Sequence, residues 1–132
     1  MMSDQPDLDL IRRVQQARAE HDAQAQPSQI AAVYWIEAKR QVAGSPPTSR
    51  AGFWLIRTTL LEVDAYWAVI KTATESGDLG YKSKVATAGR RQPNERVIHV
   101  MTCDAADAAD VARVGDALRA LGFSDITYHP PA

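Results

Sequence analysis

The chain has 132 residues, of which 45% are hydrophobic and 23% charged, and its formal net charge is −1. This length suits one domain with a buried core, and the composition is typical of a soluble globular protein. No apolar run approaches the ~20 residues of a membrane span, and the balanced charge is not that of a protein that binds double-stranded DNA. The polar N-terminus does not resemble a secretory signal, and the single Cys103 allows no internal disulfide. We therefore expect a cytoplasmic protein.

The small net charge hides a segregation along the chain. Residues 1–38 and 97–132 each carry a net charge of −3, whereas residues 39–96 carry ten basic and five acidic side chains, a net of +5. A basic middle segment is a modest indication of an anionic ligand. The alternative is a solvated charged surface with no ligand.

The N-terminal segment has helical periodicity. Leu8, Ile11, Val14 and Ala17 recur at helical spacing and predict an amphipathic helix over about 7–23, before a linker that contains Pro27. We therefore divide the chain into residues 1–28, a partly ordered helix and linker, and residues 29–132, a single domain. Residues 32–39 mix helix-favouring and strand-favouring side chains, and we predict a strand. The Gly- and Pro-rich residues 41–52 predict a loop.

The next segment has the pattern of a strand followed by a helix. The run "FWLIR" at 53–57 predicts the strand, and Thr59 with Glu62 forms a capping-box pattern for a helix over about 60–76. The apolar face of this helix contains Val63, Tyr66, Trp67, Ile70 and Ala73. Gly77 is expected to end it.

Two further strands and a second helix follow. Residues 81–87 and 96–102 predict strands around a basic loop, and the second is apolar on both faces, which predicts a central position in the sheet. Asp104 is the predicted N-cap of a helix over about 105–121. Its buried stripe should be Val111, Val114, Leu118 and Leu121. Residues 124–129 predict the last strand.

This order of elements, β-α-β-β-α-β from Gly52, indicates an α+β fold of two layers. We expect both helices side by side on one face of a mostly antiparallel sheet, with Trp54 and Trp67 buried between the layers. Ferredoxin-like topology is the ordinary arrangement for this order of elements.

Several segments together resemble a known family. They are the Gly-x-Trp-Leu-Ile strand at 52–56, Trp67 in mid-helix, the two strands around the basic loop at 81–102, and the Val-x-x-Val-Gly-x-x-x-x-x-Leu-Gly helix at 111–122. Over roughly residues 30–130 the chain resembles the family of the basophilic leukaemia-expressed protein. That family is similar in fold to the 4E-type mRNA cap-binding translation initiation factor.

The resemblance implies a curved antiparallel sheet with helices on its convex face and a ligand on its concave face. In the cap-binding proteins, basic residues that correspond to 82–91 hold phosphates, and a Trp-Glu pair binds the base. The loop at 41–51 contains neither Trp nor Glu. Only the phosphate-side residues therefore carry over to this chain.

The candidate site follows from strand alternation and this resemblance. Lys82 and Lys84 emerge on the same face of their strand, and burial of unpaired lysines is costly, so we expect them on the helix-free face. Arg90 and Arg91 could add guanidinium groups that suit phosphate. Trp35 is the candidate for stacking on a base. The alternatives are lysines that only solubilise the sheet, solvated loop arginines, and a Trp35 packed under the N-terminal segment.

We therefore expect a module that binds a phosphorylated ligand, a nucleotide or RNA, on the concave face. Some relatives of the family look like phosphothreonine lyases, so a second possibility is an enzyme with Lys84 as base and His99 as acid. The third is an interaction scaffold without a small ligand. Cys103 is either a thiol activated at a helix start or a buried structural one. The three histidines and one cysteine are dispersed, so no metal or cofactor is expected. The sequence does not indicate an oligomeric state.

Overall fold

The structure is a computed structural model of the chain, and it describes residues 10, 12–14, 16–17, 25–29, 35–89 and 92–132. Its strands are β1 (Trp35–Lys39), β2 (Phe53–Thr59), β3 (Lys82–Ala86), β4 (Glu95–Met101) and β5 (Ile126–His129), and its helical elements are η1 (Pro27–Gln29), α2 (Val63–Glu75) and α3 (Ala108–Ala120). In the predicted N-terminal helix, the described residues 10, 12–14 and 16–17 are helical. The other residues of that prediction lie outside the described part, and so do residues 32–34 of the first predicted strand.

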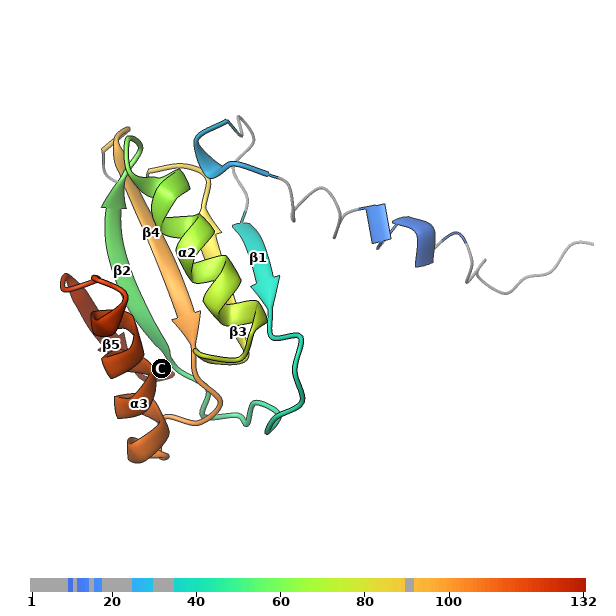
Figure 1. The fold of residues 1–132 in the computed structure, drawn as a ribbon, viewed down its shortest axis with the longest axis vertical. Helices are drawn as coiled ribbons and strands as arrows, with labels where there is room; N and C mark the ends of the chain where they lie inside the picture. The colour runs from blue at the N-terminus through green and yellow to red at the C-terminus, as the bar shows by residue number, and fades with distance from the viewer. Residues whose placement is uncertain (1–9, 11, 15, 18–24, 30–34, 90–91) are drawn as a thin grey trace, which may run out of the picture.

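The strands form one antiparallel sheet in the order β1-β3-β4-β2-β5 (Figure 1). The predicted central position of β4 is confirmed. Strand β4 lies between β2 and β3, which α2 connects, and β2 lies between β4 and β5, which α3 connects. The units β2-α2-β3 and β4-α3-β5 are therefore interlocked, which is the ferredoxin-like arrangement. Strand β1 extends this sheet at the β3 edge. The α+β prediction is thus confirmed.

Both helices pack on the same face of the sheet, as predicted (Figure 1). The Trp54 Nε1–H of β2 donates to the Val111 carbonyl of α3 at 3.0 Å. The Thr74 hydroxyl of α2 lies 2.6 Å from the Ser83 hydroxyl of β3. Trp54 and Trp67 are 8% and 2% exposed, so both are core residues. The alternate residues of the strands that face these helices, including Ile36, Ile56, Val85, Ile98 and Val100, are buried with them.

Three predicted helix features are wrong. Thr59 ends β2, and Glu62 is the N-cap of α2 without a side-chain cap bond, so the capping box does not form. Asp107, not Asp104, caps α3 by accepting from the Asp110 N–H at 3.1 Å. Leu121 lies just beyond α3 and is 43% exposed. The strand β2 is longer than predicted, and this extension displaces the start of α2. The end of α2 is as predicted, because Gly77 has a φ of +87° that favours glycine.

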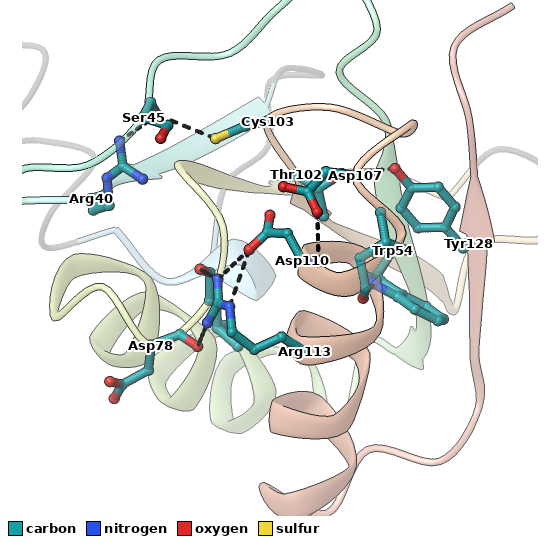
Figure 2. A network of polar contacts seen from close by, with 12 residues as sticks. Arg40, Ser45, Trp54, Asp78, Thr102, Cys103, Asp107, Asp110, Arg113 and Tyr128 are labelled. Carbon is teal, nitrogen blue, oxygen red and sulfur yellow. Dashed lines mark hydrogen bonds and ion pairs between the residues drawn. The ribbon is translucent and has the colours of Figure 1, made fainter.

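A network of arginine and aspartate contacts joins α3 to the turn after α2 (Figure 2). The Arg113 guanidinium donates to the carbonyl oxygens of Asp78 and Leu79 at 3.2 and 3.1 Å. It also donates to Asp110 on its own helix at 2.9 Å. At the other end of α2, Ser28 of η1 hydrogen-bonds the carboxylate of Asp64 through its backbone N–H at 3.0 Å and through its hydroxyl. The helical layer is therefore tied at both ends.

Candidate functional site on the open face of the sheet

The face of the sheet opposite α2 and α3 carries the residues that alternate with the core positions. No helix in the described part of the chain packs on this open face (Figure 1). Its strand positions hold four basic and two acidic side chains, so its formal charge is +2 with histidines neutral. These are Lys39, Arg57, Lys82 and Lys84 against Glu37 and Glu95. The rest are mostly apolar or aromatic.

The two predicted lysines do lie on the open face, and each has a close neighbour there. Lys82 Nζ is 3.6 Å from Glu37 Oε1 on β1, and both side chains are partly exposed. Lys84 Nζ lies 4.4 Å from the ring centroid of Trp35. An ammonium over an indole is a cation–π contact worth ~0.5–1 kcal/mol at an exposed site. The lysines are thus held by weak contacts that a stronger anionic ligand could replace.

A diagonal series of rings in contact crosses the open face, and we call it the ring row. It consists of Trp35 on β1, His99 on β4, Phe53 on β2 and His129 on β5. The ring centroids of successive members are 4.8, 4.0 and 5.1 Å apart. Phe53 is nearly parallel to both histidine rings, at interplanar angles of 8°. The histidines therefore cover the two faces of the Phe53 ring.

The predicted catalytic pair of the lyase possibility is also adjacent on this face. Lys84 and His99 are directly opposed residues of β3 and β4. Opposed residues of an antiparallel pair have Cβ atoms ~4.5–5.5 Å apart. The sequence could not show this proximity, because it depends on the register between two strands.

A buried arginine braces the loop that follows β3. Arg96 is 8% exposed and its Nη1 donates to the carbonyl oxygens of Pro93 and Glu95, both at 2.7 Å. The Arg96 side chain lies on the helix side of β4, opposite Thr58. It therefore belongs to the support of the loop rather than to the open face.

The end of the open face nearest Lys82 carries Tyr81 and Cys103. Burial raises the pKa of Tyr81, and Cys103 and Glu37 contribute to the shift. The half-buried Cys103 thiol donates to the Ser45 carbonyl at 3.3 Å, and Arg40 donates to the same oxygen at 2.9 Å (Figure 2). The thiol thus holds the loop after β1 against the end of β4. This arrangement fits the structural interpretation of Cys103.

The structure brings together three of the five predicted site residues. Lys82, Lys84 and Trp35 share the open face, whereas Arg90 and Arg91 lie outside the described residues. Phe53 and His129 also belong to this face, as members of the ring row, and the sequence did not indicate them. Strand alternation places Phe53 on one face of β2, but it does not reveal which rings of other strands lie beside it.

The described residues show neither a metal centre nor a membrane span. No group of three or more His, Cys, Asp or Glu side chains in the described part is arranged to hold a metal ion. Within the same residues, no helix has both the length and the apolar character needed to cross a bilayer.

Comparison with known proteins identifies a family. The chain matches the family model described as "Basophilic leukemia-expressed protein Bles03" over residues 13–130. No curated protein matches the chain. The matched region includes every strand of the sheet and both helices that cover it. The chain therefore belongs to the family of the basophilic leukemia-expressed protein Bles03.

Proposed function

We propose that the open face binds a phosphorylated ligand, a nucleotide or RNA, with Lys82 and Lys84 at the phosphates. The observation that carries this proposal is the position of both lysines beside the ring row on a sheet face that no described helix covers. Cations next to aromatic rings are the combination used by proteins that bind single-stranded nucleic acid.

The contacts of the lysines support a role in phosphate binding. A partly exposed ion pair such as Lys82–Glu37 contributes little to stability, because solvent screens the attraction between its charges. A charge-assisted hydrogen bond to phosphate is stronger than the cation–π contact of Lys84 with Trp35. Movement of Lys84 onto a phosphate would also uncover the Trp35 ring, so that a base could stack there.

We further propose that the protein is cytoplasmic and that its sheet resembles that of the 4E-type cap-binding factor. We expect the sheet to be used as in the 4E-type cap-binding factor, with phosphates at the strand that corresponds to β3. The loop at 41–51 has no Trp or Glu to read a methylated guanine, so the ligand proposed here is not the cap. A nucleotide or RNA ligand agrees with the cytoplasmic location that the sequence predicts.

A phosphothreonine lyase is the second candidate, and the direct opposition of Lys84 and His99 is what favours it. A lysine base and an acid on neighbouring strands could remove the α-proton and assist departure of phosphate. The Trp35 ring beside Lys84 stabilises an ammonium, whereas a base must be a neutral amine. Phosphate binding therefore has the stronger support.

The test is a titration of the protein with single-stranded RNA and mononucleotides at two salt concentrations. We expect binding that weakens steeply with salt, because each neutralised phosphate releases condensed counterions. The variant Lys82→Ala/Lys84→Ala should bind more weakly and with a smaller salt slope. The matched control is Lys71→Ala/Arg119→Ala, which removes two positive charges from the helical side and should bind like the wild type.

Each other outcome points elsewhere. No binding at low salt would contradict the proposal and favour a scaffold. Equal binding by the wild type and the open-face double variant would place the site on another surface. Elimination of phosphate from a phosphothreonine peptide, lost in Lys84→Ala, would replace the binding module by the lyase.

A further inference from the structure

We infer that the open face takes a short single-stranded oligonucleotide of about three nucleotides rather than a mononucleotide. This inference rests on the proposed function and names the ligand class of the same site. The observation behind it is that the inner rings of the ring row stack on one another, so that their faces are already covered.

The interior of the ring row has little stacking surface left for a ligand. Phe53 lies between His99 and His129 at centroid distances of 4.0 and 5.1 Å, and both pairs are parallel within 8°. His99 is also in contact with the tilted ring of Trp35 at 4.8 Å. A base that approaches the middle of the row therefore meets ring edges, whereas aromatic platforms bind bases through their faces.

The two ends of the row are where bases can stack. Trp35 lies on β1 and His129 on β5, the two edge strands of the sheet. Among the described residues, Phe53 is the one ring that stacks on His129. At the other end, the Trp35 ring is covered by the Lys84 ammonium, which a phosphate can attract away. One base at each end would therefore complete the row.

One nucleotide cannot reach both ends. The centroid distances of 4.8, 4.0 and 5.1 Å give the row a length of up to about 14 Å. Bases stacked outside the terminal rings are farther apart still. The four-stranded sheet of an RNA-recognition motif holds two or three stacked bases, so a chain of about three nucleotides fits this span.

Polar groups lie near both ends of the ring row. Lys84 lies over the Trp35 ring, and Lys82 follows on the same face of β3, next to Glu37. Both lysines can contact the phosphates of a ligand that stacks on Trp35. At the other end, the Thr127 hydroxyl lies 3.0 Å from His129 Nε2 on an exposed edge. A hydroxyl and an imidazole can hydrogen-bond the sugar or base of the far nucleotide. The ring row thus offers the ligand lysine side chains near the Trp35 end and polar hydrogen-bonding groups at the His129 end.

The experiment is calorimetric titration with uridine monophosphate and with oligouridylates of two to six nucleotides at one low salt concentration. We expect affinity to rise at least about fivefold when the ligand becomes long enough to reach both ends, and to rise little beyond four nucleotides. Abasic oligonucleotides of equal length control for the added charge, and they should not show this rise. His129→Ala should remove the gain for the longer ligands, and His129→Phe, which keeps a ring, should restore the gain.

Failure of the inference and failure of the proposed function are distinguishable. If the monophosphate binds as tightly as the longer ligands, the oligonucleotide inference is wrong and phosphate binding stands. The inference is equally wrong if abasic chains bind as well as oligouridylates, or if His129→Ala binds all lengths like the wild type. If no ligand binds, both are wrong.

Discussion

Gly115 of α3 packs against the indole of Trp54, which leaves no room for a side chain at this position. A Cβ atom at position 115 would lie 2.5 Å from Cζ2 of Trp54 and 3.0 Å from two further atoms of the same ring. The ring is 8% exposed and is held by its hydrogen bond to Val111, so it cannot easily move aside. The missing side chain lets α3 approach β2 closely. The sequence signals this only as a glycine inside a helix, where glycine is otherwise unfavourable.

We therefore predict that Gly115→Ala lowers the free energy of unfolding by ~1–3 kcal/mol, because overpacking of a filled core costs that much. Urea denaturation measures the change. Trp54→Phe removes the crowded atoms, and in the Trp54→Phe background the same Gly115→Ala change should cost less. An equal cost in both backgrounds would show that the close approach to Trp54 is not the cause.

The positions of Lys82 and Lys84 show what the sequence reveals about single residues. Their period-2 spacing predicts correctly that they share a face, and the cost of burying lysines predicts correctly which face. Their neighbours Glu37 and Trp35 could not be predicted. Those contacts depend on the antiparallel register of β1 with β3, two strands that are far apart in the chain, and no local pattern specifies that register.

At the scale of elements, the loop before β2 is fastened to the entry of α3. The Arg50 guanidinium donates to both carboxylate oxygens of Asp104, at 2.8 and 2.5 Å, and Ala105 N–H donates to the Arg50 carbonyl at 2.7 Å. These bonds explain why Asp104 does not cap the helix. The carboxylate serves Arg50 and the Ala106 N–H in a turn, and Asp107 three residues later takes the cap.

This contact predicts a pH dependence. The hydrogen bond from Arg50 lowers the pKa of Asp104 to about 2, from the ordinary value of 3.8. A lowered carboxyl pKa gives stability that is fully present above the unfolded value and is lost as the pH falls from about 4 towards 2. Asp104→Asn should therefore lower the thermal midpoint at pH 6 but make little difference near pH 2.

Thermal unfolding from pH 2 to pH 7 measures this dependence. Asp125→Asn is the control, because Asp125 is 72% exposed and lies 3.7 Å from Arg57 in a looser pair. It should change the midpoint little throughout. A difference between Asp104→Asn and the wild type that stays constant down to pH 2 would contradict the role of the Arg50–Asp104 contact.

For the whole molecule, the periodicity of the sequence predicted the strands and helices better than local motifs predicted the helix caps or the site. Four of the five strands were predicted from apolar spacing, as were both covering helices and their position on one face, because this spacing reports burial directly. The pattern at 32–39 was ambiguous, and a strand was predicted there from the loop that follows it and from the family resemblance. The capping box failed because Thr59 is used by the sheet, where it pairs with Glu95 of β4. A capping box offers two hydrogen bonds, whereas the extended strand gains the hydrogen bonds of its pairing with β4 along its length. The ring row lay beyond sequence reasoning because its members come from four different strands.

Another surface that a ligand could use lies on the helical side of the sheet. A shallow depression beside α2 is lined by residues that include Val69, Thr72 and Leu121, and two of these are exposed apolar side chains. Its lining contains no basic side chain, so it does not suit phosphate. The two surfaces lie on opposite sides of the sheet, and a residue-resolved experiment can therefore separate them.

The most direct test of the account is a map of amide chemical shifts in the labelled protein on addition of a uridine hexanucleotide. Ligand binding on the open face predicts that the largest changes fall on Lys84, His99, Phe53 and His129, across β3, β4, β2 and β5. The amides of Val69 and Leu121 should change little, since the sheet and the helical layer lie between them and the ligand. Changes centred on Val69 and Leu121, with none along the ring row, would contradict the assignment of the open face as the binding site.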